Sequence, residues 1–238
     1  MRRRDFSAIQ HLCVWLALCG AGLASQRVLA GIIYNGGFES DFSVTPNWSV
    51  SLADSGTLQR VTSWTALADP TKTILPKEGN YLLMIKSDEV PPTDTILTQN
   101  VVLSLGDIVS GWMAIDAYLS SYTYADSDYA AVRILQNSTV LFSKTLTVDQ
   151  LKNDLSLLNW QFWSWTAPAA GTYTLELRAM DDTTETGLMT WWGLFDGITI
   201  TASVVPEPSV GVALISGLVM AMALGRLRHL TDRITTRR

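Results

Sequence analysis

Residues 172–178 read Thr-Tyr-Thr-Leu-Glu-Leu-Arg, so that the apolar residues Tyr173, Leu175 and Leu177 alternate with polar ones. Successive side chains of a β-strand point to opposite faces, and this alternation is typical of a strand with one buried face and one solvated face. Residues 130–135, Ala-Ala-Val-Arg-Ile-Leu, predict a second strand of the same half-buried kind. The fold class therefore depends on antiparallel sheet.

The rest of the central chain follows the same pattern and shows no sustained helical period. Only residues 148–158 favour a helix, because leucines recur there at helical spacing. About ten short strands without a disulfide predict an all-β fold, a two-sheet antiparallel jelly-roll sandwich. The expected strands are residues 31–38, 48–52, 81–86, 95–103, 108–119, 129–136, 139–146, 160–167, 171–180 and 192–202.

Both ends of the chain look different from this centre. Residues 1–30 combine three arginines, an apolar stretch and a small-residue cleavage site, which predicts a signal peptide, with a permanent anchor helix as the alternative. Residues 210–224 are apolar and about 22 Å long as a helix, short of a hydrocarbon core of about 30 Å. They predict a single marginal transmembrane helix, and a buried core helix is the alternative. The expected domains are 1–30, a sandwich at 31–203, and a tail at 204–238.

The tail carries a recognisable motif. The triplet Pro206, Glu207 and Pro208 precedes the apolar segment, and a basic end at 226–238 follows it, beginning with Arg226 and Arg228. This order resembles the PEP-CTERM sorting signal of Gram-negative bacteria. The resemblance implies an exosortase-type processing enzyme as a partner, a transient stay in the inner membrane, and then the cell surface or extracellular matrix. Whether the tail is cleaved or kept as an anchor stays open.

The composition of residues 31–205 excludes several kinds of chemistry. Both cysteines, Cys13 and Cys19, and both histidines, His11 and His229, lie in the two ends. The central part therefore offers no Ser-His or Cys-His nucleophile and no histidine-ligated zinc site. It holds 8 Lys and Arg against 19 Asp and Glu, a net charge of −11, which argues against nucleic acid as a partner. We expect no enzyme, although a carboxylate-pair glycoside hydrolase stays open.

A second resemblance covers the central part. Residues 35–39 read Asn-Gly-Gly-Phe-Glu, residues 105–107 read Leu-Gly-Asp, and residues 194–200 read Leu-Phe-Asp-Gly-Ile-Thr-Ile. With Trp48 and Gln-Asn-Val at 99–101, these pieces resemble the galactose-binding-like jelly rolls of many carbohydrate-binding modules. The resemblance implies one structural calcium held by Glu39 and Asp196, and the alternative is that both are ordinary turn residues. Gly197 departs from the family, in which a second acidic residue often stands there.

Tryptophan is abundant, with eight of the nine lying between residues 31 and 205. Sugar rings stack on exposed aromatic faces, so some of these side chains are candidate ligand contacts. We expect Trp64, Trp160 and Trp191, which lie near loops, to be exposed and to bind ligand. The remaining candidates, Phe38, Trp112, Trp163 and Trp165, are expected to face the core.

Three function classes follow from the sequence. The first is an exported, surface-sorted, non-catalytic protein that contributes to an extracellular polysaccharide or biofilm matrix or to the cell envelope, with exopolysaccharide as a partner. The second is a specific carbohydrate-binding module, and the third is the carboxylate-pair hydrolase.

Overall fold

The structure is a computed structural model, and it describes residues 31–41, 47–53, 56–87, 93–119, 128–181 and 191–203. The expected signal peptide, the sorting motif, the apolar tail segment and the basic end lie outside these residues. By its contacts the chain divides into two units, Met1–Ala202 and Ser203–Arg238, and only Ser203 of the second is described. In the described part of the chain, no helix has the length and apolar character needed to cross a membrane.

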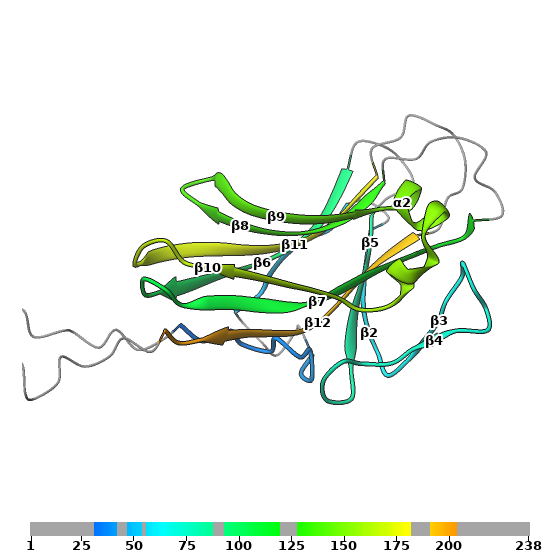
Figure 1. Ribbon diagram of the computed structural model, residues 1–238, viewed down its shortest axis with the longest axis horizontal. Helices are drawn as coiled ribbons and strands as arrows, with labels where there is room; N and C mark the ends of the chain where they lie inside the picture. The colour runs from blue at the N-terminus through cyan, green and yellow to red at the C-terminus, as the bar shows by residue number, and fades with distance from the viewer. Residues whose placement is uncertain are drawn as a thin grey trace, which may run out of the picture. The chain divides into compact units, whose positions relative to one another are not determined.

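Two five-stranded antiparallel sheets form the described domain (Figure 1). The first, sheet A, has the order β1-β6-β11-β8-β9. Its longest pairing joins β11 to β6 in a continuous register from Gly171↔Leu103 to Asp181↔Thr93. The strands of sheet A are β1 (Ser49–Ser51), β6 (Thr93–Leu103), β8 (Tyr129–Gln136), β9 (Thr139–Thr147) and β11 (Gly171–Asp181).

The second sheet, sheet B, has the order β10-β7-β12-β5-β2, and a small separate hairpin pairs β3 with β4. Figure 1 shows β8 and β9 at the top of the view and β12 at the bottom, with β10 and β7 between them. The predicted all-β, two-sheet antiparallel sandwich is confirmed. The strands are β2 (Thr57–Val61), β3 (Trp64–Thr65), β4 (Thr73–Ile74), β5 (Leu82–Lys86), β7 (Ile108–Ala117), β10 (Gln161–Thr166) and β12 (Trp191–Thr201).

The core lies between the sheets and follows the alternation read from the sequence. On β11 the side chains of Tyr173, Leu175 and Leu177 are buried, and the residues between them are partly exposed. Trp163 of β10 meets Phe142 of β9 with ring centroids 6.1 Å apart, so odd-numbered residues of β10 face the core. In the register of β10 and β7, Trp163 lies beside Gly111, and odd-numbered residues of β7 therefore face the core as well.

The expected helix at 148–158 is present in two pieces, α2 (Val148–Asn153) and the 3₁₀ turn η2 (Leu155–Leu158). Thr147 caps α2, since its side chain accepts from the backbone N–H of Gln150 and the Gln150 side chain accepts from Thr147. Asp154 breaks the helix with an extended backbone, and its carboxylate then caps η2. Leu151 and Leu158 are buried, as the leucine spacing predicts.

The expected strand at 31–38 is wrong. This segment forms turns, in which Asn35 and Phe38 have φ angles of 52° and 54°. Gly36 contacts the last strand so closely that a Cβ would lie 2.0 Å from the carbonyl oxygen of Ile198, and its own carbonyl accepts from the Ile198 N–H. The Asn-Gly-Gly sequence therefore fits a turn that packs against the end of β12. The sequence also missed β2, β3 and β4.

Candidate functional site

Residues 62–81, which join β2 to β5 and contain the β3–β4 hairpin, are called the strap here. The strap lies on the outer face of sheet B, because its anchors are even-numbered residues of β7 and β12. Asp116 of β7 is fully buried and accepts from Trp64 Nε1 at 2.7 Å, from Leu67 N at 2.7 Å and from Ala68 N at 3.0 Å. A single carboxylate thus fixes the first half of the strap.

Two further carboxylates fix its second half. Asp196 of β12 is buried and accepts from the backbone N–H groups of Lys77 at 2.5 Å and Glu78 at 3.0 Å. Glu39 is exposed and accepts from the N–H groups of Asn80 at 2.8 Å and Tyr81 at 3.0 Å. The two residues predicted to share a calcium ion therefore hold the same five-residue turn from opposite ends.

These two carboxylates do not fit the expected calcium site. Calcium needs six to eight oxygen ligands. The oxygens of Asp196 accept from three backbone N–H groups, including that of Gly197 at 2.6 Å, and both oxygens of Glu39 accept from Asn80. Among the residues described, no group of three or more His, Cys, Asp and Glu could hold a metal ion.

The pKa values of the two carboxyl groups shift in opposite directions. Burial raises the pKa of Asp196 to about 6, although three backbone N–H groups act in the opposite direction. The backbone N–H of Asn80 lowers the pKa of Glu39 below its ordinary value. Gly197 has a φ of 59° at a bulge between Asp196 and Thr199, a backbone conformation that favours glycine. This conformation accounts for the glycine at the position where the galactose-binding-like pattern often has a second acidic residue.

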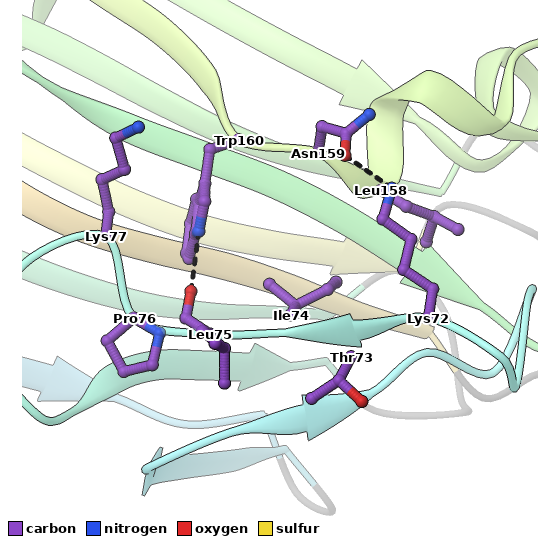
Figure 2. Close-up of a pocket in the computed structure, with 9 residues that line it drawn as sticks. All are labelled: Lys72, Thr73, Ile74, Leu75, Pro76, Lys77, Leu158, Asn159 and Trp160. Carbon is purple, nitrogen blue, oxygen red and sulfur yellow. Dashed lines mark hydrogen bonds between the residues drawn. The ribbon is translucent and has the colours of Figure 1, made fainter.

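An open groove of about 530 Å³ lies between the strap and the link from η2 to β10 (Figure 2). Ile74 and Leu158 are its buried residues. Figure 2 shows the Trp160 indole standing between Ile74 and Lys77, with Nε1 donating to the carbonyl oxygen of Leu75 at 2.9 Å. The lining residues are Lys72, Thr73, Ile74, Leu75, Pro76, Lys77, Leu158, Asn159 and Trp160.

Aromatic rings continue from the groove along the outer face of sheet B. The ammonium of Lys77 lies 4.0 Å from the ring centroid of Trp112. The Trp112 ring in turn lies 4.9 Å from that of Phe162, which is 54% exposed. Phe162 follows Trp160 by two residues in extended chain, so both rings are expected on one face. Together with Leu75, which is 60% exposed, these side chains form an apolar surface beside the groove.

The three tryptophans predicted to bind ligand have different environments. Trp160 is partly buried and lines the groove. Trp64 is also partly buried, but its N–H binds Asp116 and its ring packs on Trp192 at 5.7 Å, so it anchors the strap. The expected exposure of Trp191 is wrong, since it is 1% exposed. Trp191 belongs to β12, which lies between β7 and β5 in the middle of sheet B.

The expected core residues are mostly confirmed. Phe38 and Trp163 are buried, and Trp165 packs partly buried against Tyr173 at 5.2 Å. Trp112 is the exception, because it shares the outward face of β7 with Asp116 and is only partly buried. Sequence reasoning also missed Lys72, Leu75, Lys77, Asn159 and Phe162. Of these residues, only Phe162 could have been predicted, because it lies two residues after Trp160 and therefore on the same face of an extended chain.

The comparisons with known proteins find only low similarity. No protein-family model and no curated protein matches the sequence. A family 4 carbohydrate-binding module is similar at 17% identity and a TM-score of 0.38, covering 72% of this chain and 99% of its own. The CBM22-1 xylan-binding domain from Paenibacillus barcinonensis is similar at 14% identity and a TM-score of 0.37, covering 72% and 94%.

A third similar structure is the K2 cleaved adhesin domain of Lys-gingipain, at 15% identity and a TM-score of 0.42, covering 69% of this chain and 94% of its own. Identities and TM-scores of this size carry no argument about a ligand. The candidate site is therefore argued from its own geometry.

That geometry suits binding more than catalysis. The groove has a volume within the range of about 300–1,000 Å³ that is usual for small-molecule sites. It combines an aromatic side chain with a few polar groups, and none of the described residues that line it is an Asp or Glu. A hydrolase of the carboxylate-pair kind needs two such groups at the reacting bond.

Proposed function

We propose that this chain is an exported, non-catalytic protein that binds polysaccharide through the groove beside the strap. The observation that carries the proposal is the partly buried Trp160 in an open groove, followed by the exposed ring of Phe162. An indole held by a hydrogen bond to Leu75 presents a fixed apolar face, and sugar rings stack on such faces. Figure 2 shows that the Leu75 carbonyl oxygen points toward the indole, while the exposed Leu75 side chain points away from it.

The wider setting follows from the two ends of the chain. Residues 1–30 resemble an export signal, and Pro206, Glu207 and Pro208 resemble a sorting signal, which supports processing by an exosortase-type enzyme and delivery to the cell surface. A polysaccharide ligand at that place would be matrix exopolysaccharide. Recovery of surface protein that still carries Arg226 and Arg228 would contradict removal of the tail.

The binding proposal is tested by retention of the purified full chain in gels containing polysaccharide. We expect Trp160→Ala to lose most of the retention. Trp160→Phe should recover part of it, because phenylalanine keeps an apolar ring but loses the bond to Leu75. Tyr34→Ala is the matched control, since Tyr34 is an exposed aromatic whose backbone bonds to Gln99 and Trp48 survive the change. Equal retention of the Trp160→Ala and Tyr34→Ala variants would contradict the proposal.

A further inference from the structure

We infer that the groove binds an acidic polysaccharide, and that Lys77 pairs with the carboxylate of a uronic acid unit lying against Trp160. This inference rests on the proposed function, because it names the class of sugar for the same groove. It goes beyond that function by assigning a negative charge to the ligand and by naming Lys77 as the residue that binds the charged group.

The described residues that line the groove carry a net positive charge. Its nine lining residues include two lysines and no acid, whereas residues 31–205 as a whole hold 19 acids against 8 bases. Figure 2 shows Lys72 and Lys77 at opposite ends of the same wall. Five residues of extended chain span about 16 Å, so the two ammonium groups bracket the groove. A local excess of positive charge on an acidic protein favours an anionic ligand over a neutral one.

Neither lysine ammonium forms an ion pair within the described residues, although Asp69 lies close enough to Lys72 for the two charges to attract each other. On sheet A, by contrast, Arg133 and Arg178 form ion pairs with Glu176 and Asp94. Lys72 donates to the side-chain oxygen of Asn159 at 2.7 Å, which uses one of the three N–H groups of its ammonium.

Lys77 is exposed, and its ammonium lies over the Trp112 ring. A cation–π contact at an exposed ring is weaker than a charge-assisted bond to a carboxylate. A ligand carboxylate can therefore displace the ring as the partner of this ammonium.

The backbone of Lys77 is fixed. Its N–H donates to the buried carboxylate of Asp196. The residue is thus held beside Trp160 before a ligand arrives, and only the side chain remains to be ordered. Preorganisation of this kind lowers the entropic cost of binding. Asp196 acts here as a positioning residue for the groove wall.

The test compares two probes that differ only in charge, an oligogalacturonate and its fully methyl-esterified form, by calorimetry on the full chain. We expect the acid to bind at least about tenfold more tightly than the ester, as one charge-assisted bond would give. Lys77→Gln should remove this difference without weakening the ester. Lys144→Gln, a lysine on β9 of sheet A, is the matched control and should leave it intact. Added salt should weaken only the acid.

The outcomes separate the two proposals. If acid and ester bind equally and both depend on Trp160, the uronic acid inference is overturned while the proposed function stands. If Lys77→Gln lowers the affinity for both probes equally, Lys77 supports the groove but does not bind the ligand carboxylate, and the inference is again overturned. If neither probe binds and no other polysaccharide is retained, the proposed function is overturned together with the inference.

Discussion

The outer faces of the two sheets differ in the partners that bind their charged side chains. On sheet A, Arg178 lies between Asp94 and Glu176, and Arg133 lies 3.7 Å from the same Glu176. The positive charges of two guanidinium groups are thus neutralised by two carboxylates on that face. On sheet B the carboxylates Asp116 and Asp196 point outward too, but backbone N–H groups of the strap bind them.

The difference indicates where a ligand would bind. On sheet A, Arg133 and Arg178 already pair with Glu176 and Asp94. On sheet B the buried acids Asp116 and Asp196 hold the strap, and within the described residues neither lysine of the groove forms an ion pair. We therefore place the ligand contact on sheet B, and the predictions below test that assignment from the largest effect to the smallest.

Trp191→Ala should destabilise the fold most. Trp191 is 1% exposed and pairs with Ala117 in the middle of sheet B, so its truncation leaves a large cavity. We expect a loss of about 3–5 kcal/mol in the free energy of unfolding. Urea denaturation measures it, with Phe162→Ala as a control that should cost less than about 1 kcal/mol because its ring is exposed. Similar costs for both variants would contradict the burial described here.

Asp116→Ala should release the strap. The substitution leaves the N–H groups of Trp64, Leu67 and Ala68 without their acceptor. Unsatisfied buried donors cost about 1–3 kcal/mol each, and partial hydration of the strap reduces the total to about 2–4 kcal/mol. Limited proteolysis should then cut within residues 62–81. Asp69→Ala is the control, since the Asp69 carboxylate accepts hydrogen bonds from Thr71, two residues along the strap, and early cleavage in that variant would contradict the anchor role of Asp116.

Stability should fall between pH 4 and pH 7 because of Asp196. Burial raises the pKa of Asp196 from 3.8 to about 6, so the folded chain holds this proton more tightly than the unfolded chain. Its contribution is complete below about pH 4 and is lost as the pH rises through 6, by at most about 3 kcal/mol.

Glu39 acts in the opposite direction, since its lowered pKa stabilises the fold above about pH 4.5 and this contribution is lost as the pH falls through that lowered pKa. Glu176, whose pKa burial also raises, acts in the same direction as Asp196, so a variant must separate the two. Urea midpoints measured across this range should show a clearly smaller decline in Asp196→Asn. A decline of the same size in that variant would show that another group is responsible.

Arg178→Met should cost stability without affecting binding. The change removes the ion-pair partner of Asp94 and leaves Glu176, whose pKa burial raises, with Arg133 alone. We expect a loss of about 2 kcal/mol, between the values for surface and buried ion pairs. Retention in polysaccharide gels should stay unchanged. A loss of retention at native stability would move the ligand contact to sheet A.

Calcium should have the smallest effect. The carboxylate oxygens of Glu39 and Asp196 accept from N–H groups, so added calcium or a chelator should leave the unfolding midpoint unchanged. A midpoint that rises with calcium, and no longer does so in Glu39→Gln or Asp196→Asn, would instead support the predicted ion.

The strands were predictable because a strand with one buried face has apolar residues at every second position of its sequence. This signal identified β8 and β11 and placed Trp163 in the core. It failed at Trp112, whose aromatic character suggested burial although it shares a face with Asp116. The strand prediction also failed at residues 31–38, where the apolar residues Ile32 and Ile33 lead into a turn that contains Asn35 and Phe38.

The groove was only partly predictable. Trp160 was identified from its place beside a loop, and Trp191 was misplaced because the start of β12 lies one residue earlier than expected. The strap could not be predicted, because it depends on bonds between residues far apart in the chain, such as Leu67 with Asp116 and Lys77 with Asp196. Lysines in a loop give no sequence signal of the pocket that they border.

Hydroxyl-radical footprinting of the full chain, with and without a retained polysaccharide, tests the assignment of the ligand contact most directly. The account predicts that bound polysaccharide protects Trp160, Leu75 and Phe162, while Tyr129 and Met180 on the outer face of sheet A react as before. Protection of Tyr129 and Met180, with no change at Trp160, would contradict it.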